Sequence, residues 1–168
     1  VTETTVKAED TTMFAVWKMM NVYIESAEKS TTVIDEINDL IYGIIEKLTP
    51  DEFEADYIEL IGANGDISYE TGIGFGTDTK VYVNDSASNK VVATYSLVVY
   101  GDVDGDGVAD GQDVVLAQML CDGILTEDTV SKAVYEAADC NHDGEITQDD
   151  VNEIINAGLL TSKINQTK

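Results

Sequence analysis

The sequence predicts an α+β protein: a small β-rich N-terminal module with a helical segment, followed by an all-α C-terminal part. Short runs rich in Val, Ile, Thr and Tyr alternate with turn residues as far as Tyr100, and this composition favours strands. Beyond Tyr100, two acidic, glycine-containing segments each precede a stretch with apolar residues at helical spacing. From these shifts we expect three parts, at residues 1–30, 31–100 and 101–168.

The charge and composition of the chain exclude several functional classes. Its 168 residues include 33 Asp and Glu but only 9 Lys, for a formal net charge of −24. Binding to nucleic acid or to an anionic membrane surface depends on basic side chains, so we expect neither partner. No apolar run approaches the roughly 18 residues that span a bilayer, so membrane insertion is not expected either. One histidine and two cysteines leave a His-based triad, a multi-His zinc site or a disulfide-dense scaffold short of parts.

The first part of the chain has a helical pattern. Residues 10–28 contain no Gly or Pro, and their apolar side chains recur at spacings of three and four. These side chains are Met13, Val16, Trp17, Met20, Ile24 and Ala27. We therefore expect a helix here, either as a leader or as part of the first module.

The second part, residues 31–100, has mostly strand signals. The runs at 31–35 and 40–44 flank Asn38-Asp39 and predict a hairpin, although a helix over 34–48 is an alternative. Thr49, with Pro50 and two acids after it, predicts the start of a short helix. Further strands are expected after it, with a turn at 62–65. Those strands are 57–61, 79–83 and 90–100.

The most informative motif occurs twice in the third part, at 102–113 and at 139–150. Each copy has oxygen-bearing side chains at positions 1, 3, 5, 9 and 12 and Gly at position 6, which is the spacing of an EF-hand-type calcium loop. Calcium prefers six to eight oxygen ligands, and the glycine allows the sharp turn that folds the loop around the ion. Two complete matches in one short chain predict two calcium ions.

Apolar residues at helical spacing follow each loop, and a connecting helix over 127–138, capped by Thr126, is expected between them. Two features differ from calcium sensors of the EF-hand type. The first loop is preceded by a Val/Tyr-rich strand and Gly101 rather than by a helix, and position 12 is Asp rather than Glu in both loops. The first repeat is therefore expected to be a loop followed by a helix only.

These features together resemble the dockerin family, the assembly modules of cellulosome-type extracellular complexes. The resemblance covers about residues 101–160 and rests on the Gly-Asp-Val-Asp-Gly-Asp-Gly opening after a strand and on the two loop–helix repeats. Residues 31–100 resemble the small X modules that precede dockerins, mainly at Ile41-Tyr42-Gly43 and at 95–102. The resemblance implies an all-α dockerin with two EF-hand-like calcium loops, and a secreted protein.

The resemblance also implies a ligand set. In the first loop the ligands would be Asp102, Asp104, Asp106, Val108 through its carbonyl, Asp110 and Asp113. In the second they would be Asp139, Asn141, Asp143, Glu145 through its carbonyl, Thr147 and Asp150. Position 9 often binds through a water molecule, which applies to Asp110 and Thr147.

Dockerins bind cohesins, the receptor modules of scaffold proteins, so the resemblance implies a cohesin partner. Carried over by position, the cohesin-facing residues would be Gly111, Gln112, Gln118, Met119 and Gly123, then Gln148, Asp149, Ile155, Asn156 and Leu160. Because the repeats differ at these positions, we expect a single binding mode that uses both helices, with Met119 and Ile155 as anchors.

The resulting hypothesis is a calcium-dependent, cohesin-binding adaptor in a polysaccharide-degrading complex. The alternatives are a calcium sensor of the EF-hand type and a calcium-stabilised surface adhesin module. An enzyme is not expected, because the carboxylate pairs Glu52/Glu54 and Asp102/Asp104 lack a companion nucleophile. In the dockerin arrangement Cys121 would lie near Cys140, so a disulfide is expected, with two buried thiols as the alternative.

Overall fold

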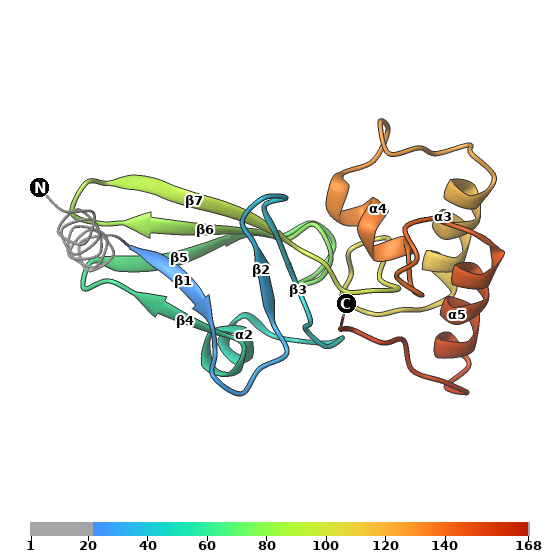
Figure 1. Cartoon of the computed structure of the whole chain (residues 1–168), viewed down its shortest axis with the longest axis horizontal. Helices are drawn as coiled ribbons and strands as arrows, with labels where there is room; N and C mark the ends of the chain where they lie inside the picture. Colours follow the sequence, from blue (N-terminus) through green and yellow to red (C-terminus); the bar gives the residue numbers. More distant parts are fainter. Residues whose placement is uncertain (1–21, 168) are drawn as a thin grey trace, which may run out of the picture.

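The computed structural model describes residues 22–167 and has a β-rich part and a helical part joined end to end (Figure 1). Most of the helix predicted over 10–28 lies outside the described residues. Its end is wrong, because Tyr23–Ser26 is strand β1. Backbone pairing of β1 with β4, Ile58–Ile61, overrides the helical spacing of the side chains there.

A five-stranded sheet, in the order β2-β3-β7-β6-β5, forms most of the β-rich part. Its strands are β2 Val33–Asp35, β3 Leu40–Tyr42, β5 Gly65–Glu70, β6 Lys80–Asp85 and β7 Lys90–Leu97. Neighbours are antiparallel except β3 and β7, which are parallel. The predicted β2–β3 hairpin is confirmed, and the alternative helix over 34–48 is wrong.

Two further elements correct or confirm the expected order. Strand β5 was not predicted, because its exposed and half-buried residues alternate and only Ile67 and Tyr69 pack against the core. Helix α2, Pro50–Asp56, begins as predicted, with Thr49 and Glu52 forming a reciprocal capping box. The hydroxyl of Thr49 accepts a bond from the Glu52 N–H, and the Glu52 carboxylate accepts one from the Thr49 N–H.

The helical part contains α3, α4 and α5, at Gly111–Cys121, Lys132–Ala138 and Gln148–Gly158. Helix α4 is shorter than predicted and is capped by Ser131 instead of Thr126. Thr126 and Thr129 exchange hydrogen bonds that close a separate turn before it. Cys121 and Cys140 are free thiols, so the expected disulfide is wrong.

The two parts meet at the segment between β7 and the first acidic loop. Strand β7 ends at Leu97 rather than at Tyr100; Val98 and Val99 follow it as buried chain, and the buried Tyr100 begins a turn closed by the Asp102 N–H, which donates to the Val99 carbonyl at 3.0 Å. The end of the chain returns to this segment, where the Gln166 side chain forms two hydrogen bonds of 2.8 Å with the backbone of Tyr100. The helical part is thus closed by both of its ends.

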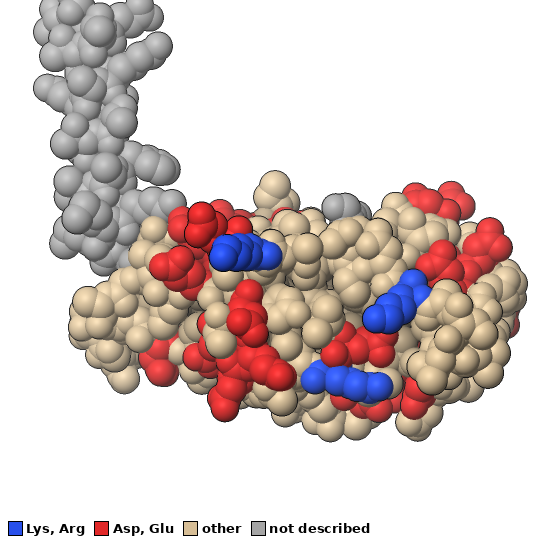
Figure 2. Space-filling view, turned by 90° about the horizontal axis from the view of Figure 1, so that it is seen from below, with Lys and Arg blue, Asp and Glu red and all other residues tan. Residues whose placement is uncertain are grey.

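Each part has its own core, but the cores are in contact. Leu40 of β3, with the half-buried Tyr42, belongs to the core of the helical part. Among the described residues, none of the helices is both long and apolar enough to span a bilayer. Acidic side chains spread over both parts on the face seen in Figure 2, with few lysines between them.

Candidate calcium loops and partner-binding face

The first acidic loop, residues 102–113, brings three carboxylates to one point. Ligand oxygens of Asp102, Asp104 and Asp106 all lie within 4.8 Å of one another. Gly105 and Gly107 have φ of +80° and +91°, a conformation that bends the chain around this point and that side chains rarely adopt. Residues 1, 3 and 5 of the motif are therefore together, as the sequence predicted.

Position 12 of the same loop closes the turn. The carboxylate of Asp113, fully buried, accepts bonds from the N–H groups of Val103 at 2.7 Å, Asp104 at 2.9 Å and Asp110 at 2.7 Å. It thus joins the beginning of the loop to the start of α3, where Asp110 caps the helix. A carboxylate oxygen has a second lone pair, so these bonds leave acceptor capacity for a cation.

The second acidic loop, residues 139–150, repeats two of these three bonds to position 12, from positions 3 and 9. Asp150 accepts bonds from the N–H groups of Asn141 at 3.1 Å and Thr147 at 2.8 Å, the equivalents of Asp104 and Asp110. Asp143 accepts one from the Glu145 N–H at 2.9 Å, as Asp106 does from Val108 at 2.8 Å. Loop 2 therefore has the backbone geometry of loop 1.

Burial opposes the charge that loop 1 must hold. It raises the pKa of Asp102 and Asp104, against backbone hydrogen bonds that lower it, and it raises the pKa of Asp113 to about 6. A bound divalent cation would reverse this effect by favouring the charged carboxylates. The donors are all oxygens, grouped and partly desolvated, which fits calcium and not a soft metal. The residues present therefore fit the ion that the motif predicts.

The position-9 side chains serve a second purpose. Asp110 and Thr147 are the N-caps of α3 and α5, and each accepts a hydrogen bond from the helix residue two positions on. Both are half-buried. This geometry suits ligation through a water molecule, which the sequence had suggested for position 9.

Helices α3 and α5 pack antiparallel, with the start of one beside the end of the other. Asp110, Gly111 and Val114 line a shallow apolar groove together with Ile155 and Leu159. The cohesin-facing candidates therefore divide into two ends of one face. The first end, which we call the apolar end, contains Gly111, Gln112, Ile155, Asn156 and Leu160; the second, the polar end, contains Gln118, Met119, Gly123, Gln148 and Asp149.

The two ends differ in exposed apolar side chains. At the apolar end, Ile155 is 36% exposed and Leu160 90%. Leu159, which the sequence analysis did not single out, lines the groove with Ile155 and is 68% exposed, and Val115 on α3 is 59% exposed. At the polar end Met119 is only half-buried and Gln148 and Asp149 are exposed. Exposure of Val115 could have been predicted, since it falls three positions before Gln118 on the helix.

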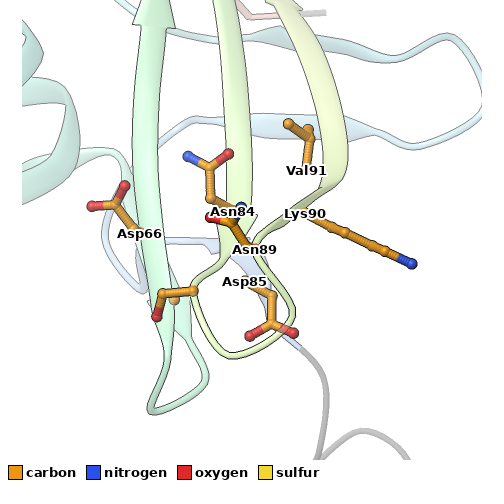
Figure 3. Close-up of a pocket in the computed structure, with 8 residues that line it drawn as sticks. Asp66, Asn84, Asp85, Asn89, Lys90 and Val91 are labelled. Atoms are coloured by element: carbon orange, nitrogen blue, oxygen red, sulfur yellow. The ribbon is translucent and has the colours of Figure 1, made fainter.

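The Glu52/Glu54 pair and the hollow at the tip of the sheet do not bring converging catalytic groups together. Glu52 is held in the capping box, and Glu54 accepts a 2.9 Å bond from the Tyr69 hydroxyl. A hollow of about 540 Å³ lies at the far tip of β5, β6 and β7. Figure 3 shows that the Lys90 side chain there points away from Asp66 and Asp85 rather than converging with them.

The helical part contains two repeats, each made of one acidic loop and one following helix. Consistent with this arrangement, residues 100–157 match the model of the dockerin type I domain family. Dockerin domains bind calcium and cohesin modules, act in cellulosome-type complexes, and are adaptors without catalytic activity. No curated protein and no solved structure matches the chain.

Proposed function

We propose that this chain is a calcium-dependent adaptor that attaches its parent protein to a cohesin module of an extracellular, polysaccharide-degrading complex. The observation that carries the proposal is the shared network of the two loops, in which position 12 closes each loop onto the N-cap of its helix. Such a network aligns two calcium sites and presents two helices as one face. Two calcium ions, one in each loop, are part of the proposal.

The ligand set of the proposal is the one implied by the motif. In loop 1 it contains Asp102, Asp104, Asp106, the carbonyl of Val108, Asp110 and Asp113. In loop 2 it contains Asp139, Asn141, Asp143, the carbonyl of Glu145, Thr147 and Asp150. The β-rich part serves as an X-module-like neighbour, and no catalytic role is assigned to either part.

The apolar end of the α3–α5 face is the proposed centre of cohesin contact. Ile155 and Leu159 line the groove with exposed aliphatic side chains, and Val115 on α3 adds a third exposed aliphatic side chain, which is the composition of an interface core. The polar end would form the rim. A half-turn of the dockerin would replace these side chains with Met119, Asp149 and their polar neighbours, so a single orientation is favoured.

The test is titration calorimetry of the full chain against a panel of cohesin modules, in calcium and in excess chelator. We expect binding to at least one cohesin in calcium, with 1:1 stoichiometry, and none in chelator. Binding that survives chelation would contradict calcium dependence. Absence of binding to every cohesin type, with calcium bound and the fold intact, would contradict the adaptor function.

A further inference from the structure

The glycine-rich loop of the β-rich part, residues 72–77, lies directly against calcium loop 1. Gly74, Gly76 and Thr77 face it through their backbones. The Gly74 N–H donates to the Gly105 carbonyl at 3.1 Å, and the Thr77 N–H donates to the Asp102 carboxylate at 2.7 Å. A candidate calcium ligand is therefore held by the neighbouring module as well as by its own loop.

Three more hydrogen bonds lie at the same contact between the two parts. The Lys47 N–H, just before α2, donates to the carbonyl of Gly107 at 2.8 Å. The Thr77 hydroxyl donates to the Val99 carbonyl at 3.1 Å and accepts from the Val99 N–H at 3.0 Å. The glycine-rich loop is thus attached both to loop 1 and to the buried chain that leads into it.

The approach is so close that it depends on glycine. A Cβ added at Gly76 would lie 2.3 Å from the Asp102 carboxylate and 2.4 Å from the Gly107 nitrogen. One added at Gly74 would lie 2.2 Å from the Asp106 carbonyl oxygen. By contrast, a Cβ at Gly72 of the same loop would have no described atom within 4 Å. Gly74 and Gly76 therefore lie where only glycine fits against loop 1, whereas Gly72 has room for a side chain.

We propose that residues 74–77 form an outer wall of calcium site 1, so that calcium binding in loop 1 and docking of the two modules stabilise each other. The proposal rests on calcium binding by loop 1, as inferred above, and goes beyond cohesin recognition. Groups that orient metal ligands from outside change metal affinity when they are lost. Coupling between two binding events is reciprocal, so calcium must also strengthen the docking.

Loop 2 has a different environment. Asp139, the equivalent of Asp102, accepts its bonds from Asp143 and Gly144 of its own loop. A Cβ at Gly144 would meet no described atom within 4 Å, whereas one at Gly107 would lie 2.8 Å from the Phe75 carbonyl oxygen. The wall therefore contacts site 1 alone, and we expect the two sites to differ in calcium affinity.

The first experiment compares Gly76→Ala with the matched control Gly72→Ala by calcium titration of the full chain. Gly76→Ala should lower the calcium affinity of one of the two sites at least about 10-fold, as loss of a group outside the ligand shell does. Gly72→Ala should leave the calcium affinity of both sites unchanged. Unchanged affinity at both sites, or equal weakening of both, would overturn the wall. Absence of calcium binding in the unmodified chain would instead overturn the proposed calcium sites themselves.

The second experiment tests the same coupling without a substitution in the glycine-rich loop, so it does not require Gly76→Ala to fold. Amide hydrogen exchange is followed at Lys47, Gly74 and Thr77, with Ser86 of the far tip as reference, in calcium. The variants are Asp106→Ala and Asp143→Ala, which remove the position-5 ligand and an equivalent local hydrogen bond from loops 1 and 2. Asp106→Ala should speed exchange at the first three amides at least about 10-fold and leave Ser86 unchanged. Equal protection in both variants would overturn the coupling.

Discussion

The two acidic loops share most of the hydrogen bonds that close them but have different surroundings. In loop 1, Asp102, Gly105 and Gly107 are buried, and the glycine-rich loop of the other module covers them. In loop 2, Asn141, Asp143 and Gly144 are exposed. The contact of loop 2 with the rest of the chain is smaller, with the His142 ring centred 4.2 Å from that of Tyr100.

The difference in surroundings comes from where each loop lies in the chain and not from the loop motif, which both repeats share. The motif fixes the turn, the ligands and the cap of the following helix in both loops. The attachment of loop 1 to a sheet determines how easily its ligands rearrange when the ion leaves. Loops of equal sequence quality can therefore bind calcium unequally, because a preorganised site does not have to order its ligands on binding.

Calcium removal should have the largest effect and should separate the loops. A ligand at about 1,000 times its Kd stabilises the folded state by about 4 kcal/mol for each site. We expect excess chelator to abolish most helical circular dichroism. Without the ion the carboxylates of each loop repel one another, and the small apolar core of the helical part cannot offset this repulsion. The sheet should keep its strands. Full helicity in excess chelator would contradict this expectation. We also expect loop 2 to lose its calcium first in a stepwise chelator titration, and release of calcium from loop 1 before loop 2 would contradict the proposed difference between the loops.

The outer faces of the two repeats can be compared in the same way. Ile155→Asp, at the apolar end, should weaken cohesin binding by about 2 kcal/mol or more, because it places a charge in the proposed interface core. Met119→Asp, at the polar end, should cost less than about 1 kcal/mol. Titration calorimetry with the cognate cohesin measures both. Near-normal affinity of the Ile155 variant, restored by a flipped orientation, would contradict a single binding mode.

The sequence was most informative where local chemistry decides the structure. The capping box at Thr49, the β2–β3 hairpin and the turn of the acidic loop at 102–106 were predicted because each depends on residues close together in the chain. Strand β1 was missed because its pairing with β4 depends on residues more than thirty positions away. No periodicity encodes such a partner.

The wall of calcium site 1 was missed for a related reason. Its signal was present in the alternating glycines Gly72, Gly74 and Gly76, which indicate close backbone approach. The pattern does not say what approaches, and Asp102 lies 26 positions beyond Gly76. Among the exposed apolar residues at the end of α5, the sequence analysis singled out Ile155 and Leu160 but not Leu159.

The pH dependence of the metal-free protein offers a smaller effect with a defined sign. Burial raises the pKa of Asp113 from 3.8 to about 6, so folding stabilises its protonated form. This contribution is present below about pH 4 and is lost as the pH rises through 6, about 3 kcal/mol in all.

In excess chelator, the helical part should therefore recover some of its helical circular dichroism on acidification from pH 7 to pH 5, because protonation of Asp113 favours the folded state. With calcium, the free energy of unfolding should fall over the same range, because protons compete with the ion for Asp113. Circular dichroism in chelator and denaturant unfolding in calcium, each at both pH values, measure the two effects. Effects of the same sign would contradict a ligand role for this carboxylate.

The smallest effect on calcium is expected from a change inside the sheet, away from loop 1. Val83 of β6 is fully buried in the core of the β-rich part, and Val83→Ala should lower the stability of that part by about 2 kcal/mol. It alters no atom of the wall, so the affinity of site 1 should change by less than about 2-fold. Denaturant unfolding and calcium titration of the same variant provide both numbers. If Val83→Ala weakened site 1 as much as Gly76→Ala, loop 1 would respond to the stability of the whole module and not to the contact at residues 74–77.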